Sequence, residues 1–171
     1  MQPLGLVTGT ATGETTLVVG CGNLLRGDDA VGPVLVRHLA ALGVPPGVRL
    51  ADAGTAGMDV AFAMRGRDRV VVVDASTGSG HPPGTLFRVP GEELEALPPP
   101  RGTNLHAFRW DQALAFARWL LKDDYPRDVV VWLVEAQALG HGHPLSPPVE
   151  RTMRDLADRL LAELTPPGGT P

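Results

Sequence analysis

Short, almost wholly apolar runs of β-branched residues recur along this chain, and they constrain its fold more than any other feature. Residues 70–73 are four valines in a row, and residues 129–134 form a second uninterrupted apolar run. Strands without polar alternation are typical of a parallel sheet that is covered on both faces. Segments with helical periodicity lie between the runs. This order predicts a three-layer α/β/α sandwich, with a twisted, mostly parallel sheet between two layers of helices.

The expected elements follow from the period of the apolar residues. We expect strands at residues 15–20, 48–52, 69–75, 85–89 and 129–134, and helices at about 29–42, 58–64 and 107–121 and at the C-terminal end. The last helix has the clearest pattern, because its apolar residues step by three or four: Val149, Met153, Leu156, Leu160 and Leu164. Ser146 is placed to cap this helix, with Pro147 in its first turn.

The length fits one domain, which we expect to span residues 14–165 between flexible tails at 1–13 and 166–171. A chain of 171 residues can bury enough surface to fold without metal or disulfide staples. Its one cysteine, Cys21, excludes an internal disulfide.

Charge and hydropathy argue against two classes of partner. The chain has 19 acidic and 15 basic residues, and no cluster of Lys and Arg, which argues against nucleic-acid binding. Its longest apolar run is far shorter than the roughly 18 residues that a membrane span requires. We therefore expect a cytoplasmic protein with no nucleic-acid or membrane partner.

Candidate functional residues follow the expected strands. In open α/β sheets, ligands bind at the carboxyl ends of the strands. Residues 20–32, 52–57 and 74–77 come directly after strands, and residues 102–106 precede a helix. We expect these four segments to meet at one edge of the sheet.

The first segment is only superficially like a dinucleotide-binding turn. It contains Gly20-x-Gly22, but Leu25 stands where the third glycine belongs, and Asp28 and Asp29 would repel a phosphate. A purely structural alternative is that Asp28 caps the following helix while Asp29 complements its dipole.

A divalent metal site is the functional alternative to these structural roles. Asp29, Asp74 and His106 can all reach the same edge of the predicted sheet, and a carboxylate that ends an apolar strand is costly unless it is solvated, paired or ligating. Carboxylate and imidazole donors suit Ni, Zn, Mn or Fe. Taken singly, each of the three could equally be a structural residue.

Two further features allow a functional and a structural interpretation. Cys21 could be a nucleophile, but a free cysteine between two glycines at a strand end is more typical of a small buried hydrophobe. His141 and His143 could form a second metal site, although a solvated loop is the simpler interpretation of Gly140-His-Gly-His.

Several motifs together resemble the maturation endopeptidases of [NiFe] hydrogenases, in order and over about residues 15–164. They are Gly20-x-Gly22-Asn23-x-Leu25-x-x-Asp28-Asp29-x-x-Gly32, Asp52-x-Gly54-Thr55-x-Gly57, Val73-Asp74-Ala75 with Pro83-Gly84, His106-Ala107-Phe108, and Leu145-Ser146-Pro147-Pro148-Val149. The resemblance implies a twisted sheet between helices. It also implies an enzyme that removes a C-terminal extension from the hydrogenase large subunit precursor after nickel insertion.

The same resemblance implies roles for individual residues. Asp29, Asp74 and His106 correspond to the residues that contact the metal and support catalysis. The substrate would supply the nickel, and no organic cofactor is expected. The glycine-threonine loop implies substrate contacts by Gly54, Thr55 and Gly57, unless these residues only form a turn.

Two other functions remain open from the sequence. One is a metal-sensing or chaperone-like binding module of hydrogenase assembly that lacks proteolytic activity. The other is a nucleotide-binding α/β protein.

Overall fold

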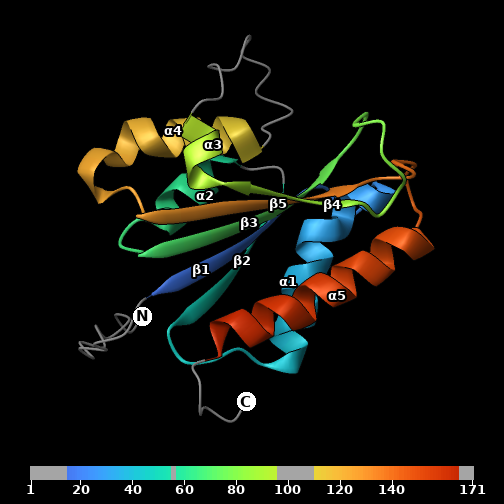
Figure 1. Ribbon diagram of the computed structural model, residues 1–171, viewed down its shortest axis with the longest axis horizontal. Coiled ribbons are helices and arrows are strands. Elements are labelled where there is room, and N and C mark those ends of the chain that lie inside the picture. Colours follow the sequence, from blue (N-terminus) through green and yellow to red (C-terminus); the bar gives the residue numbers. More distant parts are fainter. Residues whose placement is uncertain (1–14, 55–56, 96–109, 166–171) are drawn as a thin grey trace, which may run out of the picture.

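The computed structural model describes residues 15–54, 57–95 and 110–165. Its core is a five-stranded sheet with the strand order β2-β1-β3-β5-β4 (Figure 1). Four of these strands are parallel, and β4 runs antiparallel to β5. The strands are β1 (Thr16–Cys21), β2 (Val48–Gly54), β3 (Arg69–Ser76), β4 (Leu86–Pro90) and β5 (Asp128–Glu135).

Helices cover both faces of the sheet, which confirms the predicted three-layer sandwich (Figure 1). One face is covered by α1 (Val31–Leu42) and α5 (Pro147–Leu164), and the other by α2 (Gly57–Met64) and α4 (Trp110–Leu121). Two 3-10 turns, η1 (Gly27–Ala30) and η2 (Lys122–Asp124), and a short helix, α3 (Gly91–Glu95), complete the described elements.

The continuous valine runs supply both halves of the core. In β3, Val70 and Val72 pack among the side chains of α2 and α4, whereas Val71 and Val73 pack among those of α1 and α5. Successive side chains of a strand point to opposite faces, so a strand buried on both sides needs an apolar residue at every position. This is why the expected strands at 69–75 and 129–134 lack polar alternation.

Two glycines let α1 pack directly against the sheet. A Cβ atom at Gly20 would lie 2.2 Å from the carbonyl oxygen of Gly32, and one at Gly32 would lie 2.4 Å from the carbonyl oxygens of Cys21 and Val73. Any side chain at either position would push the helix away. The turn between β1 and α1 therefore stays close to the carboxyl edge of the sheet.

The structure refines several expected elements. The helix expected at 29–42 is divided into η1 and α1, and α3 was not expected. The start of the helix expected at 107–121 and both expected tails lie outside the described residues. Among the helices that the structure describes, none is long and apolar enough to cross a membrane.

Candidate active site

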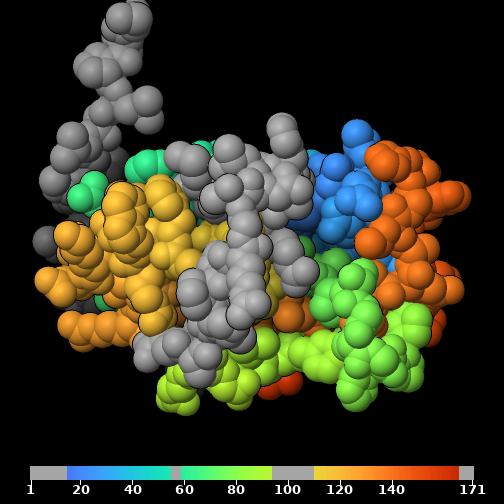
Figure 2. Space-filling view, turned by 90° about the horizontal axis from the view of Figure 1, so that it is seen from above, coloured from blue at the N-terminus to red at the C-terminus, as the bar shows by residue number. Residues whose placement is uncertain are grey.

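The carboxyl edge of the sheet brings distant segments of the chain together. Gly20 of β1 is paired with Val73 of β3, so these two parallel strands end at the same edge of the sheet. Figure 2 shows the blue segment after β1, the green segment after β3 and the orange segment after β5 gathered at one end of the molecule. This arrangement confirms that the residues following these strands share one edge.

Gly22 lies between the turn that contains Asp29 and the end of β3. Its φ angle is +125°, a conformation that residues with a side chain rarely adopt. A Cβ atom at Gly22 would lie 1.8 Å from the carbonyl oxygen of Asp29 and 3.7 Å from Oδ1 of Asp74. Glycine at this position therefore lets the backbone carbonyl of Asp29 pack directly against residue 22, which also lies near the carboxylate of Asp74.

The two acids at this junction are held in different ways. Asp74 is only 8% exposed, and its Oδ1 accepts a hydrogen bond from the backbone N–H of Ala75 at 2.8 Å. Asp29 is half-buried, and its Oδ2 accepts from the N–H of Asn23 at 3.1 Å. Within the described ranges, no donor bonds to Oδ1 of Asp29.

Asp28 has a role that the sequence did not reveal. Its fully buried carboxylate accepts hydrogen bonds from the N–H groups of Gln137, Ala138 and Ser146 and from the hydroxyl of Ser146. Burial raises the pKa of Asp28, but the hydrogen bonds from Ser146, Ala138 and Gln137 outweigh it and hold this pKa below its usual value. Asp28 therefore remains ionised at neutral pH.

This geometry tests two capping interpretations, that of Asp28 before the first helix and that of Ser146 before the last helix. Neither η1 nor α1 has a side-chain cap, so the structural alternative in which Asp28 caps the helix is wrong. Ser146 does occupy the N-cap position of α5, with Pro147 directly after it, but its hydroxyl bonds to Asp28 instead of to the helix.

Glu135 is a buried acid at the same edge that was not predicted from the sequence. It ends β5, is 5% exposed, and accepts hydrogen bonds from the Ser76 hydroxyl at 2.9 Å and the Ser79 N–H at 3.1 Å. Burial raises its pKa, but the bonds from Ser79 and Ser76 lower it further than burial raises it. Like Asp74, Glu135 ends an apolar run, and that position was the signal that could have identified it.

The environment of Cys21 is unsuited to a nucleophile. The side chain is 6% exposed. Burial raises the pKa of its thiol, and the negative charges of Asp74 and Asp52 raise it further. The thiol is therefore protonated at neutral pH, as a small buried hydrophobe would be.

The second loop also contributes to this edge. The carbonyl of Gly54 accepts a hydrogen bond from the N–H of Gly22 at 2.9 Å, and the Gly54 N–H donates to Oδ1 of Asp52. Gly57 begins α2. Thr55 and His106 lie outside the described residues. The structure thus places Asp29, Asp74 and Gly54 around Gly22.

The two histidines of the 140–143 segment are exposed. Within residues 15–54, 57–95 and 110–165, no group of three or more His, Cys, Asp or Glu side chains is arranged to hold a metal ion. The described residues give no support to a second metal site at His141 and His143.

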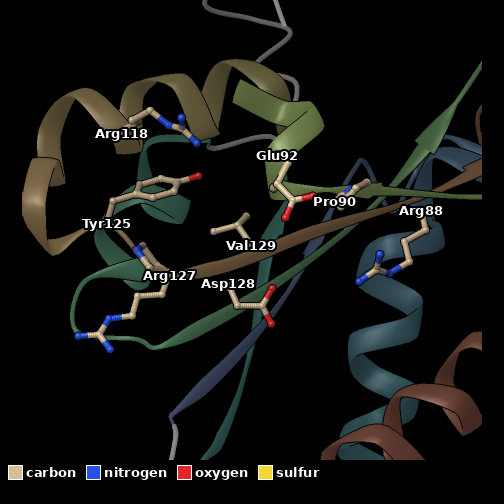
Figure 3. A pocket seen from close by; sticks show the side chains of 10 residues that line it. Arg88, Pro90, Glu92, Arg118, Tyr125, Arg127, Asp128 and Val129 are labelled. Carbon is tan, nitrogen blue, oxygen red and sulfur yellow. The ribbon is translucent and has the colours of Figure 1, made fainter. Parts of the chain in front are cut away.

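A pocket of about 330 Å³ lies at the opposite end of β5 (Figure 3). Its lining includes Asp128 and Val129 at the start of that strand, Tyr125 just before it, and Glu92 of α3. The guanidinium of Arg118 stacks 4.8 Å from the centre of the Tyr125 ring. This pocket is separate from the carboxyl edge that holds Asp29 and Asp74.

Comparisons with known proteins all point to proteases of hydrogenase maturation. The family model described as hydrogenase maturation protease matches residues 33–163. The hydrogenase 2 maturation protease of Escherichia coli K12 is 30% identical over 156 residues, which cover 89% of this chain and 92% of that protein. The hydrogenase expression/formation protein HoxM of Azotobacter vinelandii is 32% identical, with 89% and 72% covered.

The fold matches a solved structure of the same kind. The hydrogenase maturating endopeptidase HybD of E. coli has a TM-score of 0.73 and 28% identity, with 88% of this chain and 91% of that chain covered. Fold and relatives together define the class of this protein, which is an endopeptidase built on an α/β/α sandwich. The chain belongs to the hydrogenase maturation protease family.

Proposed function

We propose that this enzyme removes the C-terminal extension of a [NiFe]-hydrogenase large subunit precursor after nickel has been inserted. In this proposal Asp29, Asp74 and His106 contact the nickel that the substrate holds. The observation that supports it most directly is that the backbone carbonyl of Asp29 and the carboxylate of Asp74 both lie close to Gly22.

The donors at this junction suit the nickel of a substrate. Carboxylate oxygens and an imidazole are suitable ligands for a divalent first-row metal. Asp29 offers an oxygen, Oδ1, to which no described residue donates, and Asp74 adds a second negative charge at the neighbouring strand end. An incoming divalent cation would be attracted by both carboxylates.

The described residues also bear on the chemistry of cleavage. Cys21 is the one cysteine of the chain, and its thiol stays protonated, so we assign it no part in bond breaking. Peptide hydrolysis needs a polarised carbonyl and an activated water. A divalent metal supplies either effect, as a Lewis acid or by lowering the pKa of bound water.

Recognition of the metal would make cleavage conditional on nickel insertion. A precursor without nickel would present no cation to Asp29 and Asp74, so it would bind weakly and stay uncut. Gly54, Thr55 and Gly57 would contact the substrate chain beside the metal, because Gly54 is hydrogen-bonded to Gly22. The proposed location of the reaction is the cytoplasm.

The test is to incubate the enzyme with nickel-loaded and nickel-free precursor and to weigh the products by mass spectrometry. We expect a shortened large subunit and a released C-terminal peptide from the loaded form alone. Stable binding of the loaded form without a shortened product would favour a binding module. Equal cleavage of both forms would contradict nickel recognition.

A further inference from the structure

We propose that Asp28 is a positioning residue that fixes residues 136–146, here called the tied loop, for binding of the precursor. This inference rests on the proposed function and extends it to a second segment of the site. Asp28 directly precedes the proposed nickel contact Asp29. Its carboxylate bonds to the loop that follows β5.

The carboxylate of Asp28 holds the tied loop at both ends. Oδ2 accepts from the N–H of Gln137 at 2.8 Å and of Ala138 at 2.9 Å, near the start of the loop. Oδ1 accepts from the N–H of Ser146 at 2.6 Å, and Oδ2 accepts from the Ser146 hydroxyl at 2.9 Å, at the end of the loop. One ionised side chain thus satisfies four donors, and hydrogen bonds to a charged group are stronger than neutral ones.

Backbone contacts attach the middle of the loop to the same turn. The N–H of Asp28 donates to the carbonyl of Ala138, and the N–H of Gly142 donates to the carbonyl of Leu25 at 3.0 Å. Gly27 has a φ angle of +55°, and a Cβ there would lie 2.7 Å from the carbonyl oxygen of Ala138. The turn at 25–28 and the tied loop therefore form one hydrogen-bonded unit.

This unit presents a surface beside Asp29 that no other described element covers. Leu25 is 69% exposed although its own carbonyl is held by Gly142, and His141 and His143 are also exposed. A surface that is already fixed before binding loses less conformational freedom when a partner docks. We therefore assign the tied loop to precursor binding, and Asp28 to holding it in place.

The first test replaces Asp28 by Asn, which keeps its size but turns one acceptor into a donor. Hydrogen exchange should become faster at the amides of Gln137, Ala138 and Ser146 by a larger factor than at the amides of β1 and β3, which exchange through global unfolding. The KM for nickel-loaded precursor should rise about tenfold, with kcat within about twofold. Asp68→Asn is the matched control, because Asp68 also accepts from a backbone N–H and a hydroxyl, those of Thr15, away from the site.

A second variant perturbs the contact without changing charge. Gly27→Ala places a Cβ against the Ala138 carbonyl and should raise KM in the same way. Gly66→Ala is its control, since Gly66 has a φ angle of +70° but a Cβ atom there would meet no described atom within 4 Å. The control should keep the wild-type KM.

The outcomes separate this inference from the proposed function. If wild-type enzyme does not cut the loaded precursor, the proposed function fails, and this inference fails with it. If wild-type enzyme cuts it and the Asp28 and Gly27 variants exchange faster but keep their KM, only the positioning role is overturned. A lower kcat at unchanged KM would also overturn it, since that is the signature of a smaller folded fraction.

Discussion

The carboxylate of Asp28 accepts a 2.6 Å hydrogen bond from the backbone amide of Ser146, 118 residues further along the chain. Ser146 is the N-cap residue of α5. The bond therefore connects the turn after the first strand to the start of the last helix. It holds together, at the carboxyl edge of the sheet, two segments that are far apart in the sequence.

The loss of this connection should lower stability. In Asp28→Asn, at least one of the four donors faces an amide N–H, and a buried donor without a partner costs about 1–3 kcal/mol. We expect the free energy of unfolding in urea to fall by about 2 kcal/mol. A loss no greater than that of Asp68→Asn would contradict the role of Asp28 in the fold.

Acid should destabilise the protein through the same groups. Asp28 and Glu135 have pKa values below their ordinary 3.8 and 4.5 in the folded state, so the unfolded chain binds protons first as pH falls. Their stabilising effect is complete above about pH 5 and is lost as pH falls through the folded pKa values, below about 4. Urea titrations at pH 7, 4 and 3 should show this decline, and Asp28→Asn should flatten it. An equally steep decline in the variant would assign acid sensitivity to other groups.

Replacing either described acid of the junction should abolish processing. Asp29→Asn and Asp74→Asn remove the charges that we propose meet the substrate's nickel, so kcat/KM should fall at least about a hundredfold. Circular dichroism should show a folded protein in both. Asp155→Asn, an exposed change on α5, is the control and should process normally. Processing by either site variant at more than about a tenth of the wild-type rate would count against the assignment.

Gly22→Ala should damage the site without removing any functional group. The added Cβ would overlap the Asp29 carbonyl in a backbone conformation that disfavours side chains. We expect the free energy of unfolding to fall by at least about 2 kcal/mol. We also expect processing activity to be lost. Gly78→Ala is the matched change, because Gly78 has a φ angle of +79° and a Cβ there would meet no described atom within 4 Å. Equal stability of the two variants would show that the close approach at Gly22 is unimportant.

Cys21→Ala should leave processing intact. Because burial and the nearby Asp74 raise the pKa of this thiol, iodoacetamide should modify it far more slowly in the folded protein than in urea. Rapid modification of the folded protein, or loss of processing in a folded variant, would reopen the case for a cysteine nucleophile.

Periodicity was enough to predict the sandwich, because the runs at 70–73 and 129–134 are buried on both faces. The shared edge of the turn after β1 and the end of β3 was also predictable, because neighbouring parallel strands end at the same edge of a sheet. The short α3 had no such signal. The capping interpretation of Asp28 was wrong because it considered only hydrogen-bond partners close in the sequence. The actual partners of Asp28 are Gln137, Ala138 and Ser146.

Three further residues of the site, Glu135, Thr55 and His106, could not be assigned from the sequence and the structure together in the same way. Glu135 was not among the predicted site residues, although its place directly after an apolar run matches that of Asp74 and both side chains are buried. Thr55 and His106 remain predictions, because they lie outside the described residues. Their proposed roles rest on the resemblance of their motifs.

The central claim is that Asp29 and Asp74 recognise nickel held by the substrate. Its most direct test is the affinity of wild-type enzyme and of Asp74→Asn for nickel-loaded and nickel-free precursor, measured by calorimetry. We expect wild-type enzyme to bind the loaded form at least about tenfold more tightly, and Asp74→Asn to bind both forms alike. An unchanged preference for the loaded form in Asp74→Asn would contradict the claim.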